Sequence, residues 1–185
     1  MFRRLFGKPP ERVAAERIYG AIVQQARSAA FFEGDGAPDT VEGRFELLTI
    51  HMHLTLRRLK AEADGDPRLA QTLFDVFFQN MDDSLRELGV GDLSVGKKIR
   101  KMAEAFYGRV GAYEQALDAG AEGRASLVDA LSRNVFGEDA APAAAPLADY
   151  AIAADAALKY QAAAAIADGA ITFPPAPRLA GANAA

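Results

Sequence analysis

The sequence has no cysteine, no tryptophan and only two histidines among its 185 residues. Without cysteine, disulfides, thiolate zinc sites, iron–sulfur clusters and cysteine nucleophiles are excluded. There is no run of about 18 apolar residues, so no segment is expected to span a membrane. The start of the chain, MFRRLFGKPP, lacks the apolar core of a secretory signal.

The composition is that of a soluble globular protein, with 50% apolar and 25% charged residues. Its length allows one domain of ordinary size plus tails. The net charge of −4 is mild. A general nucleic-acid binder usually carries a clear basic excess, so no specific nucleic acid is expected as a partner.

Apolar residues recur at intervals of three and four over most of the chain, and no segment alternates as a strand does. This pattern predicts a single all-α domain of about six helices with flexible N- and C-terminal tails. The expected helices are 11–28, 41–63, 67–88, 94–119, 124–136 and 147–168. Helix 41–63 has apolar stripes on opposite sides, which predicts that it is central and buried. Helices 67–88 and 94–119 should complete the core.

The same pattern divides the chain into five parts. Residues 11–137 should form the helical core, and the alanine-rich helix 147–168 should dock loosely on it. Residues 138–146 read as a Pro/Ala linker. The remaining two parts are a flexible basic and apolar tail (1–10) and an extended or disordered tail (169–185).

No constellation indicates catalysis, a metal or a cofactor. His51 and His53 point in different directions on a helix and cannot share a metal as an i, i+4 pair would. Asp82 and Asp83 lie about 100° apart and are not a catalytic dyad, although Asp82 should pair with Arg86 one turn later. Gly91–Lys98 imitates a phosphate loop, but a lysine replaces the required Ser or Thr and a helix precedes it.

Helix 94–119 is strongly basic in its first half. This face is either simply solvated or a patch for an acidic partner, RNA or anionic lipid headgroups. It lacks the interleaved exposed aromatic residues of a stacking nucleic-acid surface. Gly108 and Gly111 either weaken the helix or permit a close neighbour. The basic residues are Lys97, Lys98, Arg100, Lys101 and Arg109, opposed in that span by Glu104.

Several strings together resemble the ubiquinol–cytochrome c chaperone family. They are GRFELLTIHMHLTLRRL (43–59), LFDVFFQNMDDSLRELGVGDLSVGKKIRKMAEAFYGR (73–109) with the following AY, IYGAIVQQAR (18–27) and LSRNVF (131–136). The resemblance covers roughly residues 15–165. The combination of LRELGVGD, VGKK and AFYGR is fairly specific, whereas each string alone is weak.

The resemblance implies an all-helical, non-enzymatic assembly factor for ubiquinol–cytochrome c reductase (complex III). Such a protein binds newly made cytochrome b and needs no cofactor or small-molecule substrate. The usage rich in alanine, glycine and arginine is typical of a bacterial homologue, which would be cytoplasmic and peripheral on the inner membrane. A eukaryotic homologue would occupy the matrix side. Mitochondrial members also use a small partner protein and contact the ribosome, and the ribosome contact stays open for this chain.

We expect the client to be held by charged contacts and a shallow apolar groove. The candidates are charged residues within the family-like strings that no catalytic scheme needs. They are Arg44, Asp82, Arg86, Glu87, Asp92, Lys97, Lys98 and Lys101. The alternative function is a generic helical adaptor or membrane-surface protein that uses residues 1–10 and the basic helix.

Overall fold

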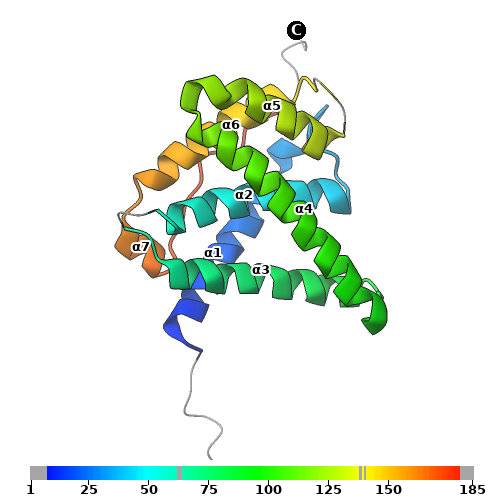
Figure 1. The fold of residues 1–185 in the computed structure, drawn as a ribbon, viewed down its shortest axis with the longest axis vertical. Coiled ribbons are helices and arrows are strands. Elements are labelled where there is room, and N and C mark those ends of the chain that lie inside the picture. The colour runs from blue at the N-terminus through cyan, green and yellow to red at the C-terminus, as the bar shows by residue number, and fades with distance from the viewer. Residues whose placement is uncertain (1–7, 62–63, 138, 140, 180–185) are drawn as a thin grey trace, which may run out of the picture.

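The computed structural model describes residues 8–61, 64–137, 139 and 141–179, and all regular structure in them is helical (Figure 1). This confirms the all-α prediction. Short 3-10 turns cover Ala29–Phe31 and Gly120–Gly123, and a π-helical turn, Ser132–Phe136, continues α5. The α-helices are α1 (Pro10–Ala26), α2 (Val41–Leu59), α3 (Pro67–Glu87), α4 (Asp92–Asp118), α5 (Arg124–Leu131), α6 (Ala144–Lys159) and α7 (Ala163–Ala167).

The starts of α2 and α3 follow from local capping. The Thr40 hydroxyl accepts a hydrogen bond from the Gly43 backbone N–H at 3.1 Å. Asp66 accepts bonds from the first backbone N–H groups of α3, whose first residue is Pro67. Side chains that accept bonds from otherwise unpaired N–H groups are preferred at this position. The loop before α2 packs tightly, because a Cβ on Gly43 would lie 2.0 Å from the Pro38 carbonyl oxygen.

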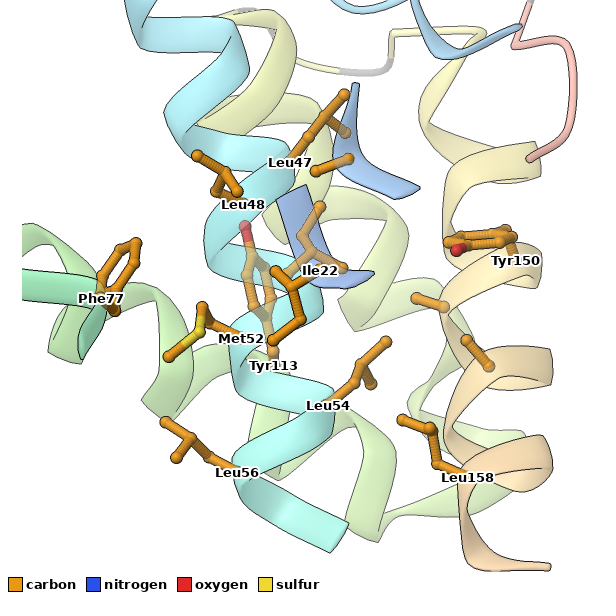
Figure 2. Close-up of a cluster of buried hydrophobic side chains, with 14 of the residues drawn as sticks. Ile22, Leu47, Leu48, Met52, Leu54, Leu56, Phe77, Tyr113, Tyr150 and Leu158 are labelled. Atoms are coloured by element: carbon orange, nitrogen blue, oxygen red, sulfur yellow. The ribbon is translucent and has the colours of Figure 1, made fainter. Parts of the chain in front are cut away.

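Helix α2 lies at the centre of the molecule and contacts α1, α3, α4 and α6. Figure 2 shows its apolar side chains leaving in two directions, toward Phe77 of α3 on one side and toward Tyr150 and Leu158 of α6 on the other. This confirms the two predicted stripes. The labelled α2 side chains are Leu47, Leu48, Met52, Leu54 and Leu56, all buried.

The core differs from the predicted one in its other members. Helix α1 packs along α3, and α6 packs against α2 and α5. Leu147, Tyr150 and Leu158 of α6 belong to the same hydrophobic cluster as α2, so α6 is a core helix and does not dock loosely. Its small alanines allow this close packing, with Ala148 and Ala154 fully buried.

The C-terminal third also differs in its boundaries. The expected helix 147–168 is two helices, α6 and α7, separated by residues 160–162. In the expected linker 138–146, α6 already begins at Ala144, and Ala141 and Ala143 are buried. A run of alanines that is short of long apolar side chains looks like a linker in sequence, yet it packs closely against a helix.

Residues 170–179 form an extended segment that packs on the helices, so of the two alternatives predicted for this part of the tail the extended one is found and the disordered one is wrong. Ile171 and Leu179 are buried. The Gln25 side chain donates to the Pro174 carbonyl oxygen at 2.8 Å. Prolines prevent helix formation but not apolar burial. The expected tail residues 1–7 and 180–185 lie outside the described residues.

His51 of α2 contacts both α6 and the extended segment 170–179. Its Nδ1 lies 2.7 Å from the Leu47 carbonyl oxygen, and its Nε2 lies 2.8 Å from the Tyr150 hydroxyl, to which Gln25 also donates. The ring is fully buried beside Phe173 of the extended segment. Burial disfavours the charged imidazolium and lowers the pKa of His51 from 6.5 to about 4.

We expect His51 to weaken the fold as the pH falls from 6.5 toward 4. In that window the unfolded chain takes up a proton at His51 and the folded chain does not, so acid favours unfolding. The loss is about 2 kcal/mol near pH 5. Urea titrations between pH 7 and pH 5 measure it, and His51→Gln should show a correspondingly shallower pH dependence. An equal dependence in both proteins would show that His51 titrates normally in the fold.

Candidate functional site

Three of the eight predicted site residues meet at the turn between α3 and α4. The Arg86 guanidinium donates to Asp82 one turn earlier, with Nε 2.5 Å from Oδ2, and also contacts Asp92 at the start of α4. These two carboxylates raise the pKa of Arg86. The pairing of Asp82 with Arg86 confirms the i, i+4 expectation. All three residues are thus engaged with one another and fix the turn.

The other five predicted residues do not join this cluster. Arg44 lies at the start of α2 and pairs with Asp39, with Nε 2.6 Å from Oδ1. Glu87 is exposed at the end of α3. Lys97, Lys98 and Lys101 are exposed on the first half of α4. The structure therefore separates the eight residues into a paired turn, a basic helix face, an isolated pair at Arg44 and the exposed Glu87.

A groove of about 790 Å³ lies between α2, α3 and α4, and none of the eight predicted residues lines it. The aromatic and aliphatic part of its wall comes from all three helices. This part comprises Leu56, Ala61, Pro67, Ala70, Phe74, Phe106, Tyr107, Val110 and Gly111. The polar part comprises His53, Arg57, Lys60, Gln71, Glu114, Asp118 and Lys159.

The apolar wall follows from the way α4 crosses the other helices. Phe106 is buried and its ring centroid lies 5.9 Å from that of Phe74. The neighbouring Tyr107 ring also lies 5.9 Å from Phe74, but 60% of Tyr107 is exposed. Gly111 lines the groove beside open space, because a Cβ there would meet no atom within 4 Å. Of the two sequence interpretations for Gly108 and Gly111, the close neighbour is not found at either position.

Arg57 organises the polar end of the groove. It contacts Glu114 and lies 2.7 Å from Asp118 on α4 and 3.1 Å from Asp155 on α6. These contacts raise its pKa, although burial opposes them and is the largest single influence. Lys159 adds a 2.6 Å contact to Asp155. Helices α2, α4 and α6 are thereby joined at one ion cluster.

His53 is the most buried of the polar residues that line the groove. It is 2% exposed, and its Nε2 lies 3.4 Å from the Glu114 carboxylate without a hydrogen-bond partner among the described residues. Burial, and next the charge of Arg57, lower its pKa to about 4. The ring is therefore neutral at pH 7. The arrangement offers an apolar, aromatic surface with a charged rim, which suits an amphipathic helix or helix end.

The sequence predicted a shallow apolar groove but not its position or lining, because its wall combines residues that are far apart in the chain, such as Arg57 and Glu114. Nothing in the sequence next to His53 and Arg57 on α2 indicates that Glu114 and Asp155 will lie beside them. Within the described residues there is no group of side chains suited to a metal ion and no helix long and apolar enough to cross a membrane.

We expect Arg57→Met to lower the free energy of unfolding by about 2 kcal/mol, because it leaves the buried Asp155 carboxylate without its guanidinium partner. Chemical denaturation measures the change. Arg124→Met is the matched control, since Arg124 forms an exposed ion pair with Asp149 and exposed pairs contribute little. Equal losses in the two variants would contradict the role given to Arg57.

Comparison with known proteins gives a consistent family match. Residues 35–173 match the family described as ubiquinol-cytochrome C chaperone. The chain is 23% identical over 106 residues to ubiquinol-cytochrome-c reductase complex assembly factor 1 of Xenopus laevis, covering 57% of this chain and 53% of that protein. It is 24% identical to the Mus musculus protein of the same name, covering 69% and 42%. The chain thus spans about half the length of these relatives.

A solved structure extends the likeness to most of the chain. The crystal structure of the Cbp3 homologue from Brucella abortus is similar with a TM-score of 0.79 and 38% sequence identity. The match covers 90% of this chain and 92% of that one.

Proposed function

Since the chain belongs to the ubiquinol-cytochrome C chaperone family, we propose that it is an assembly factor for ubiquinol–cytochrome c reductase that binds newly made cytochrome b. The names of the Xenopus and mouse relatives support the assembly role. The client itself is our inference. It acts by binding alone, with no catalytic step and no cofactor.

The groove between α2, α3 and α4 is the observation that carries this proposal. A newly made membrane protein exposes apolar helices that aggregate unless they are covered. Phe74, Tyr107 and Val110 offer apolar surface along the groove, and the ion cluster at Arg57 lies at its polar end. The end of a client helix can place apolar side chains on the apolar surface and polar groups against the ion cluster.

The eight charged residues predicted from the sequence have a different part in this proposal. Arg44, Asp82, Arg86 and Asp92 are engaged in ion pairs within the chain. Glu87 and the lysines of α4 have exposed side chains outside the groove. We therefore propose that Glu87 and the lysines of α4 make a second contact, separate from the groove that holds the client. The protein would work on the cytoplasmic side of the inner membrane in a bacterium.

We expect Gly111→Leu to reduce cytochrome b capture about tenfold, which corresponds to ~1.4 kcal/mol of binding free energy. The new side chain fills the groove, and it enters open space without disturbing the fold. A pull-down of the tagged variant from membranes, with quantification of co-purified cytochrome b, measures the effect. The b-type haem absorbance of complex III in a complemented deletion strain gives a second readout.

Gly108→Leu is the control for this experiment. Gly108 is also on α4, also has open space around its Cβ and does not line the groove. Its variant should capture cytochrome b as the unaltered protein does. Equal capture by both variants would place the client elsewhere on the surface, and normal complex III in the deletion strain would contradict the proposed function as a whole.

A further inference from the structure

The turn between α3 and α4 exposes apolar side chains at a corner of the molecule, at the lower right in Figure 1. Leu93 is fully exposed, at 101% of its reference area, and Leu88 is 68% exposed. They flank Gly89, whose φ of +80° forms the bend. Two leucines held outward on one tight turn form a small apolar projection that contributes nothing to the core.

Directly behind this projection, α4 carries four cations within five residues. They are Lys97, Lys98, Arg100 and Lys101, all exposed. None of them forms an ion pair with a residue that the structure describes. By contrast, most of the other arginines among the described residues are paired. Residues 88–101 carry a net charge of +3 on a chain whose net charge is −4.

The acidic groups near the turn are partly neutralised. Arg86 contacts both Asp82 and Asp92, the two carboxylates that close the turn. Glu87 and Glu104 remain without an ion pair among the described residues, and Asp83 accepts a hydrogen bond from Gln79. Lys97 and Lys101 are one helical turn apart and lie on the same side of α4 as Leu93, away from the buried Val95.

We propose that this tip, defined as Leu88, Leu93, Lys97, Lys98, Arg100 and Lys101, docks the protein on an anionic phospholipid bilayer. The leucines enter the interface between headgroups and acyl chains, and the cations contact the lipid phosphates. RNA fits less well, because exposed leucines offer bases no stacking surface. This contact is separate from the groove, so it would orient the groove beside a membrane-bound client.

Vesicle flotation of the purified full chain tests the proposal. The protein should float with vesicles of phosphatidylcholine plus phosphatidylglycerol, but not with phosphatidylcholine alone, and added salt should weaken the binding. Lys97→Glu with Lys101→Glu should reduce the bound fraction at least tenfold. Leu88→Ser with Leu93→Ser should do the same without changing the charge.

The matched control is Arg68→Glu with Arg133→Glu. Both are exposed residues on other helical segments with no ion pair among the described residues, and the pair changes the net charge by the same amount as the lysine pair. Equal loss in this control would mean that overall charge, and not the tip, decides binding. Failure of the unaltered protein to float, or binding of a polyuridine RNA with no binding of anionic vesicles, would overturn the proposal.

The absence of cysteine permits a site-specific second readout. Leu93→Cys labelled with an environment-sensitive fluorophore should shift to the blue on anionic vesicles. Ser126→Cys on α5, also exposed, should not shift. A shift at Ser126 and none at Leu93 would place a different face on the membrane. Because no client is present, these results are independent of whether the groove binds cytochrome b.

Discussion

Helix α2 has apolar side chains on two opposite faces, and this requires other helices to cover it on both sides. Helix α3 covers one face and α6 the other, as Figure 2 shows. Burying a leucine side chain contributes about 2 kcal/mol, and α2 alone supplies Leu47, Leu48, Leu54 and Leu56 to the interior. The positions of the neighbouring helices are set by the need to bury the apolar faces of α2. The groove forms where α4 crosses α2 and α3.

The polar edges of α2 fix the positions of its neighbours. A buried polar group is costly unless a partner satisfies it. Glu46 therefore pairs with Arg109 of α4. The His51 ring forms a hydrogen bond with the Tyr150 hydroxyl of α6. Arg58 donates to the Leu158 carbonyl oxygen and to the Asp64 carboxylate. Burial raises the pKa of Glu46, and its Arg109 partner opposes this. Arg57 also pairs with a buried carboxylate, that of Asp155, while its other partners, Glu114 and Asp118, are more exposed and line the groove, where their charges form part of its rim.

Much of the helical architecture could be predicted from the sequence, because periodicity and capping are local. The apolar stripes of α2, the cap at Asp66 and the pair Asp82–Arg86 each depend only on residues close together in the sequence. The role of α6 was predicted wrongly, since helix 147–168 was expected to dock only loosely, because alanines bury little area each. A shallow apolar groove was expected, but its position could not be predicted, since it depends on the crossing of α4 over α2 and α3. The candidate residues were chosen by their charge, and they lie at the turn between α3 and α4, on the basic face of α4 and at Arg44 instead.

In-cell photocrosslinking tests most directly whether the groove between α2, α3 and α4 holds the client. Tyr107 is exposed in the groove, and benzoylphenylalanine replaces it with a similar aromatic ring. We expect a crosslink to cytochrome b from this position and none from Ser126 on α5. A crosslink to cytochrome b from Ser126 alone would contradict it.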